Sequence, residues 1–409
     1  MGAAPNPRRH GITIALIVLT FGLFPLWGVG HRLYDTLLPQ FATLFSLHGF
    51  ALAMAGGLYS ILYFVGAFPA ALCARRFGYK TAIVIGLGLA CMGAFLLYPA
   101  GETKSFAYFL SAAAIMSLGW IQLEVAANPL VIELGSRKNA VQRLNLAQSF
   151  YVPGSLAGVL VGNWLLKLSQ GSGDGPIFHS LSHPYIIFAA ILLIFTIMVE
   201  DAHFPPLRAE RDGTLPAVLA EMRRLVRQRL IVFAIVAQAF SVVAMASTWT
   251  ISSMLAPIPL FTGLGGIAMA SLVIFGAGRF FGAGIMRWIA PERVLTVFAA
   301  CGAVVSLAAF FAGNTTGAVL LLVSNFFLSI LWPTILGLAI RDLRATMKIA
   351  TALICMGGAV GGFAHRLIAA YIYPVSLGTG FIGLAIAYGV VLAFAIGCER
   401  FRGRSAALV

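Results

Sequence analysis

Residues 79–99 read YKTAIVIGLGLACMGAFLLYP, and this stretch decides the fold. A helix that crosses a lipid bilayer needs about 20 consecutive, mostly apolar residues. The only charged side chain in the stretch is Lys80, near its beginning. Its glycines are compatible with a membrane, where small residues let neighbouring helices pack closely. The stretch therefore predicts a transmembrane helix.

The rest of the chain repeats this pattern. With residues 79–99 included, apolar runs lie at 12–44, 50–73, 79–99, 105–134, 142–168, 184–203, 229–256, 262–288, 293–313, 316–340, 347–372 and 376–399. Hydrophobic residues make up 60% of the chain and charged residues 10%, with a mean hydropathy of +0.95. A soluble domain carries about 25% charged residues. The sequence predicts an all-α membrane protein with twelve transmembrane helices.

The positive charge of the chain predicts its orientation. Lys and Arg number 27 against 13 Asp and Glu, a net charge of +14. These charges stand between apolar runs and form no continuous stripe, which argues against nucleic-acid binding. If the N-terminus is inside, 23 of the 27 cations fall on the inner side, and only Lys104 and Lys167 fall outside. Cytoplasmic loops are rich in Lys and Arg, so both termini are predicted to be cytoplasmic in the inner membrane.

Motifs for metal sites and for catalysis are missing from the sequence. The five cysteines form no CxxC or Cys/His spacing, which argues against a disulfide framework and a zinc site. The chain also has no metal-spaced His/Asp cluster, nucleophile elbow or phosphate-cradling loop. We therefore expect neither a cofactor nor a metal. A membrane enzyme or receptor is the least favoured interpretation.

An internal repeat divides the chain into two halves. Arg75 and Arg279 are 204 residues apart, as are Gly78 and Gly282, and Pro129 and Pro333. Two repeats in parallel orientation place a binding site between them near the midplane of the membrane. We predict six-helix halves at 1–203 and 229–409. The linker 204–228 is predicted to be cytoplasmic and to end in a basic amphipathic helix attracted to anionic headgroups.

Four charged residues within the apolar runs stand out as candidates at membrane depth: Arg32, Asp35, Glu124 and Arg366. A charge at membrane depth costs about 2.5–3.5 kcal/mol on insertion scales, so each needs a partner or a function. Arg32 and Asp35 are three residues apart and can form a local ion pair. Asp35 is then either a static partner or a carboxylate that exchanges protons. Glu124 has no cation near it in sequence, and desolvation favours its protonated form, which suits proton coupling.

Polar and aromatic residues inside the runs are candidates for substrate binding, because amides pair with hydroxyl groups and aromatic faces pack against sugar rings. These candidates are Arg32, Tyr34, Gln40, Gln122, Asn128, Asn145, Gln148, Gln238, Trp249, Asn325 and Trp332. Charged residues at the predicted cytoplasmic ends of the spans are candidates for gating, with plain interfacial charges as the alternative. The gating candidates are Arg75, Glu133, Arg279 and Asp342.

Three stretches carry a family resemblance. Residues 37–41 after Asp35, residues 123–129 around Glu124, and residues 143–148 are similar to the L-fucose permease group. This group is the fucose–galactose–glucose:proton symporter family of the major facilitator superfamily. The resemblance implies the major facilitator fold, with two pseudo-symmetric six-helix bundles, and proton-coupled sugar uptake by alternating access. It also implies that Glu124 is tied to protonation and Asp35 to substrate recognition or coupling.

The chain departs from the family pattern before the aspartate, where His31, Arg32 and Tyr34 replace Asn-rich positions. An Arg32 that holds Asp35 ionised would alter coupling, so an uncoupled facilitator, or a transporter of a different small solute, stays as the alternative. The expected partners are a small substrate, a proton and membrane lipids. We expect a monomer.

Overall fold

The computed structural model describes residues 7–46, 49–103, 105–171, 177–204, 214–254, 266–373 and 376–406, and every regular element in these ranges is helical. The first half contains α1 Pro7–Leu44, α2 Gly49–Thr103, α3 Phe106–Glu133, η1 Arg137–Asn139, α4 Ala140–Ser149, α5 Tyr151–Gly171 and α6 Ile177–Asp201. Between the halves lies α7 Leu215–Leu225. The second half contains α8 Arg229–Met254, α9 Gly266–Ile285, α10 Pro291–Ala312, α11 Asn314–Leu328, α12 Leu331–Ile340, η3 Arg344–Thr346, α13 Met347–Tyr371 and α14 Leu377–Ala406.

The structure contains the twelve predicted spans if α2, which turns at Gly78, is counted as two spans. Eleven segments among the described residues are long and apolar enough to cross a membrane, and the 45-residue segment Gly56–Ala100 is one of them. As one straight helix this segment would be about 68 Å long, more than twice the ~30 Å hydrocarbon core. It turns at Gly78, whose φ of 84° and ψ of 175° are not helical. The segment is therefore two spans, as the separate runs at 50–73 and 79–99 predict.

Two other spans are broken by proline. Helices α4 and α5 meet at Phe150, three residues before Pro153, and α11 and α12 meet at Ser329–Ile330, just before Pro333. A proline has no N–H, and its ring clashes with the carbonyl four residues earlier. Each helix therefore ends at this point and resumes within one or two residues. Both breaks leave backbone carbonyls that need another donor.

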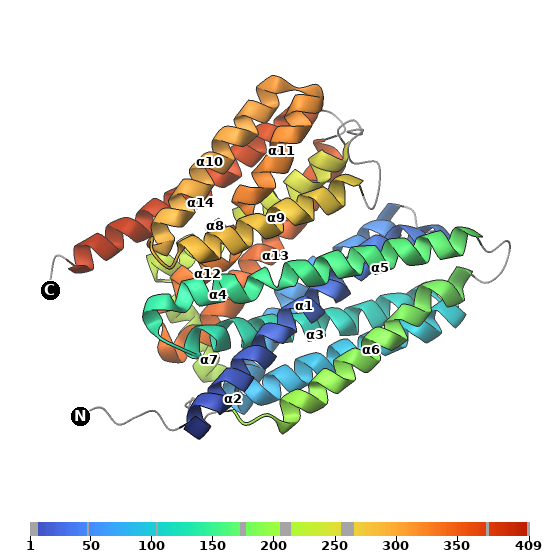
Figure 1. Cartoon of the computed structure of the whole chain (residues 1–409), viewed down its shortest axis with the longest axis horizontal. Coiled ribbons are helices and arrows are strands. Elements are labelled where there is room, and N and C mark those ends of the chain that lie inside the picture. Colours follow the sequence, from blue (N-terminus) through green and yellow to red (C-terminus); the bar gives the residue numbers. More distant parts are fainter. Residues whose placement is uncertain are drawn as a thin grey trace.

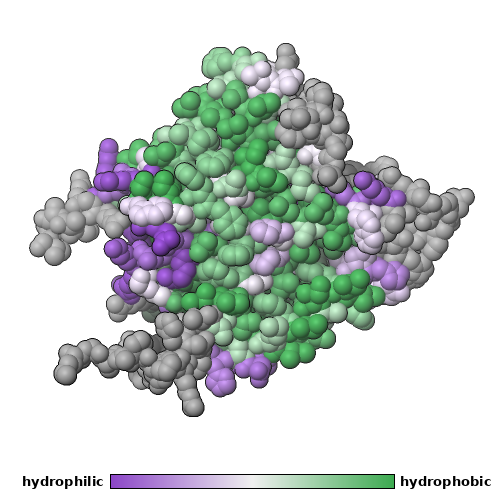
Figure 2. All heavy atoms as spheres, viewed as in Figure 1, coloured by the Kyte–Doolittle hydropathy of each residue, from purple (hydrophilic) through white to green (hydrophobic). Residues whose placement is uncertain are grey.

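Helices α1 to α6 and α8 to α14 form the two halves, which lie side by side (Figure 1). Helix α1 begins and α14 ends at the same end of the bundle, which we call the terminal end, and the opposite end is called the far end. Hydrophobic side chains form a wide belt between hydrophilic groups near the two ends (Figure 2). This distribution fits a bilayer around the middle of the molecule.

The two halves use equivalent close helix contacts. In the first half, a Cβ on Gly28 would collide with the Tyr151 carbonyl, and one on Gly154 with the Pro25 carbonyl. Helices α1 and α5 are therefore in backbone contact. In the second half, a Cβ on Gly361 would collide with the Ala239 carbonyl, which brings α13 equally close to α8. In each half, glycines therefore allow close contact between the first and the fifth span.

We predict that Gly154→Ala destabilises the protein, because the new methyl group meets the Pro25 carbonyl, which belongs to the backbone and cannot turn aside. Overpacking typically costs about 1–3 kcal/mol, so the melting temperature in detergent should fall. The matched control is Gly389→Ala in α14, where a Cβ would meet nothing within 4 Å. A Gly154→Ala variant that melts at or above the wild type would contradict the proposed contact.

Candidate functional site

A cavity of about 320 Å³ lies between the halves. Helices α1 and α5 supply one wall, and α8 and α9 of the other half supply the opposite wall. Its lining residues are Arg32, Asp35, Thr36, Val159, Asn163, Trp249, Ile267, Ala268, Ser271 and Leu272. These residues belong to the parts of the four helices nearer the far end. The volume is at the lower limit of ordinary small-molecule pockets, which are about 300–1,000 Å³.

Arg32 joins the two halves across this cavity. Its Nη1 donates to Asp35 Oδ2 at 3.3 Å, and its guanidinium carbon lies 4.2 Å from the centroid of the Trp249 ring. A cation over an indole face is attracted by the ring quadrupole. The Trp249 ring is held in place because its Nε1–H donates to Asn325 Oδ1 at 2.9 Å. Arg32 therefore has a fixed position in the cavity wall.

Asp35 is accessible and faces two cations. Its side chain is 59% exposed and lines the cavity, so water can reach the carboxylate. Arg32 and Arg366 are the two charged residues that act on it electrostatically within the described part of the chain. Arg366 extends from α13 toward α2, where a Cβ on Gly56 would lie 2.8 Å from its Nη1. The acid in the cavity wall is outnumbered by cations.

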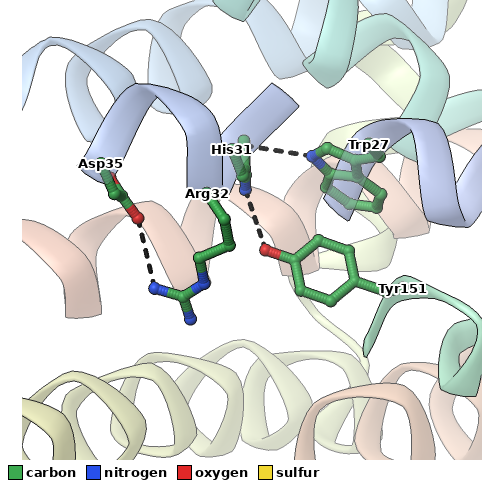
Figure 3. A network of polar contacts seen from close by, with 5 residues as sticks. All are labelled: Trp27, His31, Arg32, Asp35 and Tyr151. Atoms are coloured by element: carbon green, nitrogen blue, oxygen red, sulfur yellow. Dashed lines mark hydrogen bonds and ion pairs between the residues drawn. The ribbon is translucent and has the colours of Figure 1, made fainter. Parts of the chain in front are cut away.

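His31 lies in a separate network beside Arg32 (Figure 3). Trp27 Nε1–H donates to His31 Nε2 at 3.1 Å, and His31 Nδ1 lies 3.2 Å from the Tyr151 hydroxyl. An indole N–H is a donor only, so His31 Nε2 accepts and carries no proton. The proton of a neutral His31 is therefore on Nδ1 and is donated to Tyr151. The contact connects α1 with α5 beside the cavity.

Glu124 is buried in α3 with 3% exposure and is not part of the cavity lining. The sequence places no cation near it, but the fold brings Arg279 of α9, from the other half, close enough to act on its charge. Asn128 Nδ2 donates to the Glu124 backbone carbonyl at 3.0 Å. The predicted pair of acids is therefore separated: Asp35 faces the cavity, and Glu124 is buried away from its lining.

Arg279 satisfies backbone carbonyls at both proline breaks. The residue is 5% exposed. Its Nε donates to the Ser329 carbonyl at 2.8 Å, and its Nη1 donates to the Gln148 carbonyl at 2.7 Å. Ser329 is four residues before Pro333, so this carbonyl has no helical N–H partner. One guanidinium thus bridges the break in α11–α12 and the break in α4–α5, which belong to different halves.

The halves also touch near the terminal end. Lys348 Nζ of α13 lies 4.4 Å from the centroid of the Tyr79 ring in α2. Thr334 Oγ1–H donates to Asn145 Oδ1 at 3.2 Å. A Cβ on Gly337 would lie 3.2 Å from Val141 Cγ1. These contacts pack the two halves together on the terminal side of the cavity.

Several predicted substrate ligands are used within the protein instead of in the cavity. Gln122 Nε2 donates to the Ala70 carbonyl at 3.3 Å, and Gln148 Nε2 donates to Asn128 Oδ1 at 2.9 Å. Tyr34 stacks on Phe109 with 6.0 Å between ring centroids. Of the predicted binding residues, Arg32 and Trp249 line the cavity, with Asp35 beside them.

Two further candidates lie together in the second half. Gln238 is fully buried, and neither of its amide atoms has a hydrogen-bond partner among the described residues. It faces Gly358, as does the indole nitrogen of Trp332. Gln238 is therefore an available amide near the interface. Gln40 belongs to α1, but its side chain lies outside the described residues.

The predicted gating residues have different partners. Arg75 pairs with Glu221 of α7, which attaches the helix between the halves to α2. Glu133 accepts from the Tyr79 hydroxyl at 2.8 Å. Asp342 has a side chain that is 75% exposed and pairs with its neighbour Arg341 at 3.4 Å. Arg279 makes hydrogen bonds that join the two halves, to the Ser329 and Gln148 carbonyls.

Sequence reasoning missed several residues that the fold brings to the site. Asn163 and Ser271 line the cavity, and they are the kind of isolated polar side chain within an apolar run that can mark a lining position. Lys348 and Thr334 make contacts between the halves. No group of three or more His, Cys, Asp or Glu side chains suited to a metal ion occurs in the described ranges.

Comparison with known proteins places this geometry in a family. The sequence profile of the Major Facilitator Superfamily matches residues 12–365. An L-fucose-proton symporter of Escherichia coli (strain K12) is 30% identical, and the alignment covers 98% of this chain and 96% of that protein. A glucose/galactose transporter of Brucella abortus is 28% identical, with 87% of each chain covered.

Solved structures agree with the sequence relatives. A structure of the major facilitator superfamily transporter FucP in the outward conformation superposes with a TM-score of 0.82 at 30% identity, covering 95% of this chain and 99% of that one. The proton:xylose symporter XylE superposes with a TM-score of 0.70 at 14% identity, which supports the fold alone.

The electrostatic interaction between Glu124 and Arg279 predicts energetic coupling between them. Arg279→Leu removes the guanidinium that bonds to the Ser329 and Gln148 carbonyls, and it leaves Glu124 without its cation. We therefore expect a clear loss of thermal stability in detergent. Adding Glu124→Gln to that variant should restore part of the loss, with a coupling of about 0.5–3 kcal/mol.

The matched control is Arg75→Leu, at the equivalent repeat position, combined with Glu124→Gln. Arg75 pairs with Glu221, so these two changes should be additive. Equal coupling in the two cycles, or none in either, would contradict a specific interaction between Glu124 and Arg279.

Proposed function

Because the chain belongs to the Major Facilitator Superfamily, in its family of L-fucose permease-like symporters, we propose that it carries a sugar together with a proton by alternating access. The observation that carries this proposal is a cavity between the two halves with an accessible carboxylate, Asp35, in its wall. Relatives that align with most of the chain are named L-fucose-proton symporters and glucose/galactose transporters.

The substrate enters from the far end in this proposal. The contacts at Tyr79–Lys348 and Val141–Gly337 keep the halves together on the terminal side. For release on the terminal side these contacts separate, and the cavity closes at the far end. The hydroxyls of Thr36 and Ser271 and the amide of Asn163 are the groups in the cavity that suit sugar hydroxyls.

We assign the proton site to Glu124, with Asp35 as the acid in contact with substrate and water. An ionised Glu124 attracts Arg279, whereas a protonated Glu124 leaves Arg279 to the Gln148 and Ser329 carbonyls. Arg279 contacts both halves, so the charge on Glu124 biases the interface that must open.

We propose that the terminal end faces the cytoplasm, since the Lys and Arg residues gather there. Helix α7 then lies at the inner surface, with Arg223 and Arg224 in its last turn available for anionic headgroups. The fold has a complete cavity within one chain, and the proposed transporter works as a monomer in the inner membrane.

A second candidate function is uncoupled, facilitated transport. The Arg32–Asp35 ion pair favours it, because a carboxylate held by a neighbouring cation can serve as a static partner instead of a proton carrier. In that case the same cavity moves its solute down the concentration gradient. The two functions differ in their response to an imposed proton gradient.

Replacing Glu124 with Gln should remove coupling and retain the transport pathway. Glutamine keeps the size and polarity of the side chain but carries no exchangeable charge. In proteoliposomes with an inward proton gradient, the wild type should accumulate labelled sugar, whereas Glu124→Gln should only exchange it. Accumulation by Glu124→Gln equal to the wild type would rule out Glu124 as the coupling site.

Cross-linking the terminal side should stop the cycle. A Cβ on Gly337 would lie 3.2 and 3.3 Å from the two Cγ atoms of Val141, within reach of a disulfide, whose Cβ atoms are about 3.5–4.5 Å apart. In the Val141→Cys, Gly337→Cys variant, oxidation should abolish uptake, and reduction should restore it. Each single-cysteine variant is the control, because the chain has five native cysteines. Normal uptake by the cross-linked protein would refute the proposed motion.

A further inference from the structure

The charged side chains that surround Asp35 include one more cation than acid: Arg32 and Asp35 line the cavity, whereas Arg366 acts on Asp35 from outside the lining. Asp35 is the acid, and the two groups that act on it electrostatically within the described residues are the cations Arg32 and Arg366. Asp35 is likewise the acid that acts on Arg366. One cation is therefore left without a counter-charge. At membrane depth such a charge is costly, which makes it a sign of function.

Both cations have unused hydrogen-bonding capacity. A guanidinium has five N–H donors. Among the described residues Arg32 makes a single hydrogen bond, to Asp35, and its Nε is buried without a partner. Trp249 covers one face of the Arg32 guanidinium, and Asp35 uses its Nη1, so an acceptor in the cavity has to approach the Nη atoms at its edge. Arg366 is exposed and makes no hydrogen bond or ion pair with a described residue.

Held by a stacking ring, a guanidinium presents the flat fork that binds carboxylates through two parallel hydrogen bonds. The rest of the lining is suited to a polyol, because Asn163, Thr36 and Ser271 carry amide and hydroxyl groups. The Ser271 hydroxyl is buried without a partner. The volume of about 320 Å³ suits one sugar ring better than a chain of them.

We propose that the substrate is an acidic monosaccharide, such as a hexuronate, whose carboxylate pairs with Arg32 in the cavity between the halves. This inference rests on the proposed sugar transport and specifies its substrate class. The anion supplies the missing counter-charge, and a neutral hexose does not. The hydroxyls of the ring bind the polar groups of α5 and α9.

The charge of the substrate has a consequence for energetics. A monoanion that moves with one proton carries no net charge across the membrane. A neutral sugar that moves with one proton carries one positive charge, which a membrane potential drives at about 2.3 kcal/mol per 100 mV. Hexuronate uptake should therefore respond to the pH gradient and not to the electrical potential.

The experiment measures uptake of labelled D-glucuronate and D-galacturonate against D-glucose and D-galactose in proteoliposomes of the full chain. A pH gradient and a potassium–valinomycin potential are imposed separately. We expect at least tenfold greater accumulation of a hexuronate than of its neutral counterpart, with no response to an inside-negative potential.

Arg32→Gln should remove the preference for the acid by about tenfold or more, since it loses a charge-assisted hydrogen bond and keeps a polar group. Arg287→Gln is the matched control, because Arg287 is an exposed cation outside the cavity lining. If Arg32→Gln does not fold, thermal shift of the wild type decides instead: a hexuronate should stabilise it, and the neutral hexose should not.

The outcomes separate the two proposals. Potential-driven accumulation of neutral hexoses, with no uptake or competition by hexuronates, overturns the acidic substrate and leaves sugar symport standing. Failure of all four sugars to bind or move overturns sugar transport itself. An equal loss of hexose and hexuronate uptake in Arg32→Gln also overturns the proposed pairing, because a structural role would produce that result.

Discussion

The Arg279 guanidinium is the interaction on which the arrangement of the two halves depends. Pro333 leaves the Ser329 carbonyl without a helical donor, and the break before Pro153 exposes the Gln148 carbonyl. An unsatisfied backbone group in a water-free interior costs several kcal/mol. Arg279 satisfies both at once, and its charge is in turn felt by Glu124. Two helix breaks, a buried acid and the contact between the halves therefore share one side chain.

The repeat in the sequence explains why there are two halves but not why they differ. Arg75 and Arg279 occupy equivalent positions 204 residues apart. Arg75 lies at the terminal end and pairs with Glu221 of α7, whereas Arg279 is buried in the interface. The twelve spans, the turn at Gly78 and the repeat could be predicted because they depend on local composition and spacing. The same local pattern cannot say which arginine faces the other half.

The sequence pointed to the acids Asp35 and Glu124, but not to the residues of the other half that lie beside Arg32 and Glu124. Arg32 and Asp35 are neighbours on one helix, so their ion pair follows from sequence. The contacts Arg32–Trp249 and Glu124–Arg279 join residues from different halves and depend on how each helix is rotated. The amides Gln122, Asn128 and Gln148 were predicted to face substrate, but they bond to other helices. In a membrane a polar side chain needs an internal partner, and this need competes with ligand binding.

The separation of Asp35 from Glu124 puts a requirement on any coupling between substrate and proton. Several side chains lie between the cavity and the buried acid. His31 directly precedes Arg32 in α1 and bonds to Tyr151, and the Arg279 guanidinium carbon lies 6.0 Å from the centroid of the Tyr151 ring. His31 also packs edge-on against Tyr59, on which the charge of Glu124 acts.

These contacts place Tyr151 next to residues of both the cavity and the buried Glu124 site. A substrate that drew Arg32 away from Asp35 would act on α1, and α1 shares the His31–Tyr151 hydrogen bond with α5. A change of charge on Glu124 shifts Arg279, which lies against the same tyrosine. Coupling requires that Tyr151 has two positions, and that substrate binding at Arg32 and the charge on Glu124 each favour one position over the other. A ligand moves an equilibrium only by its differential affinity for the two states. His31 and Tyr151 are therefore the side chains through which the charged cavity and the buried Glu124 can influence each other.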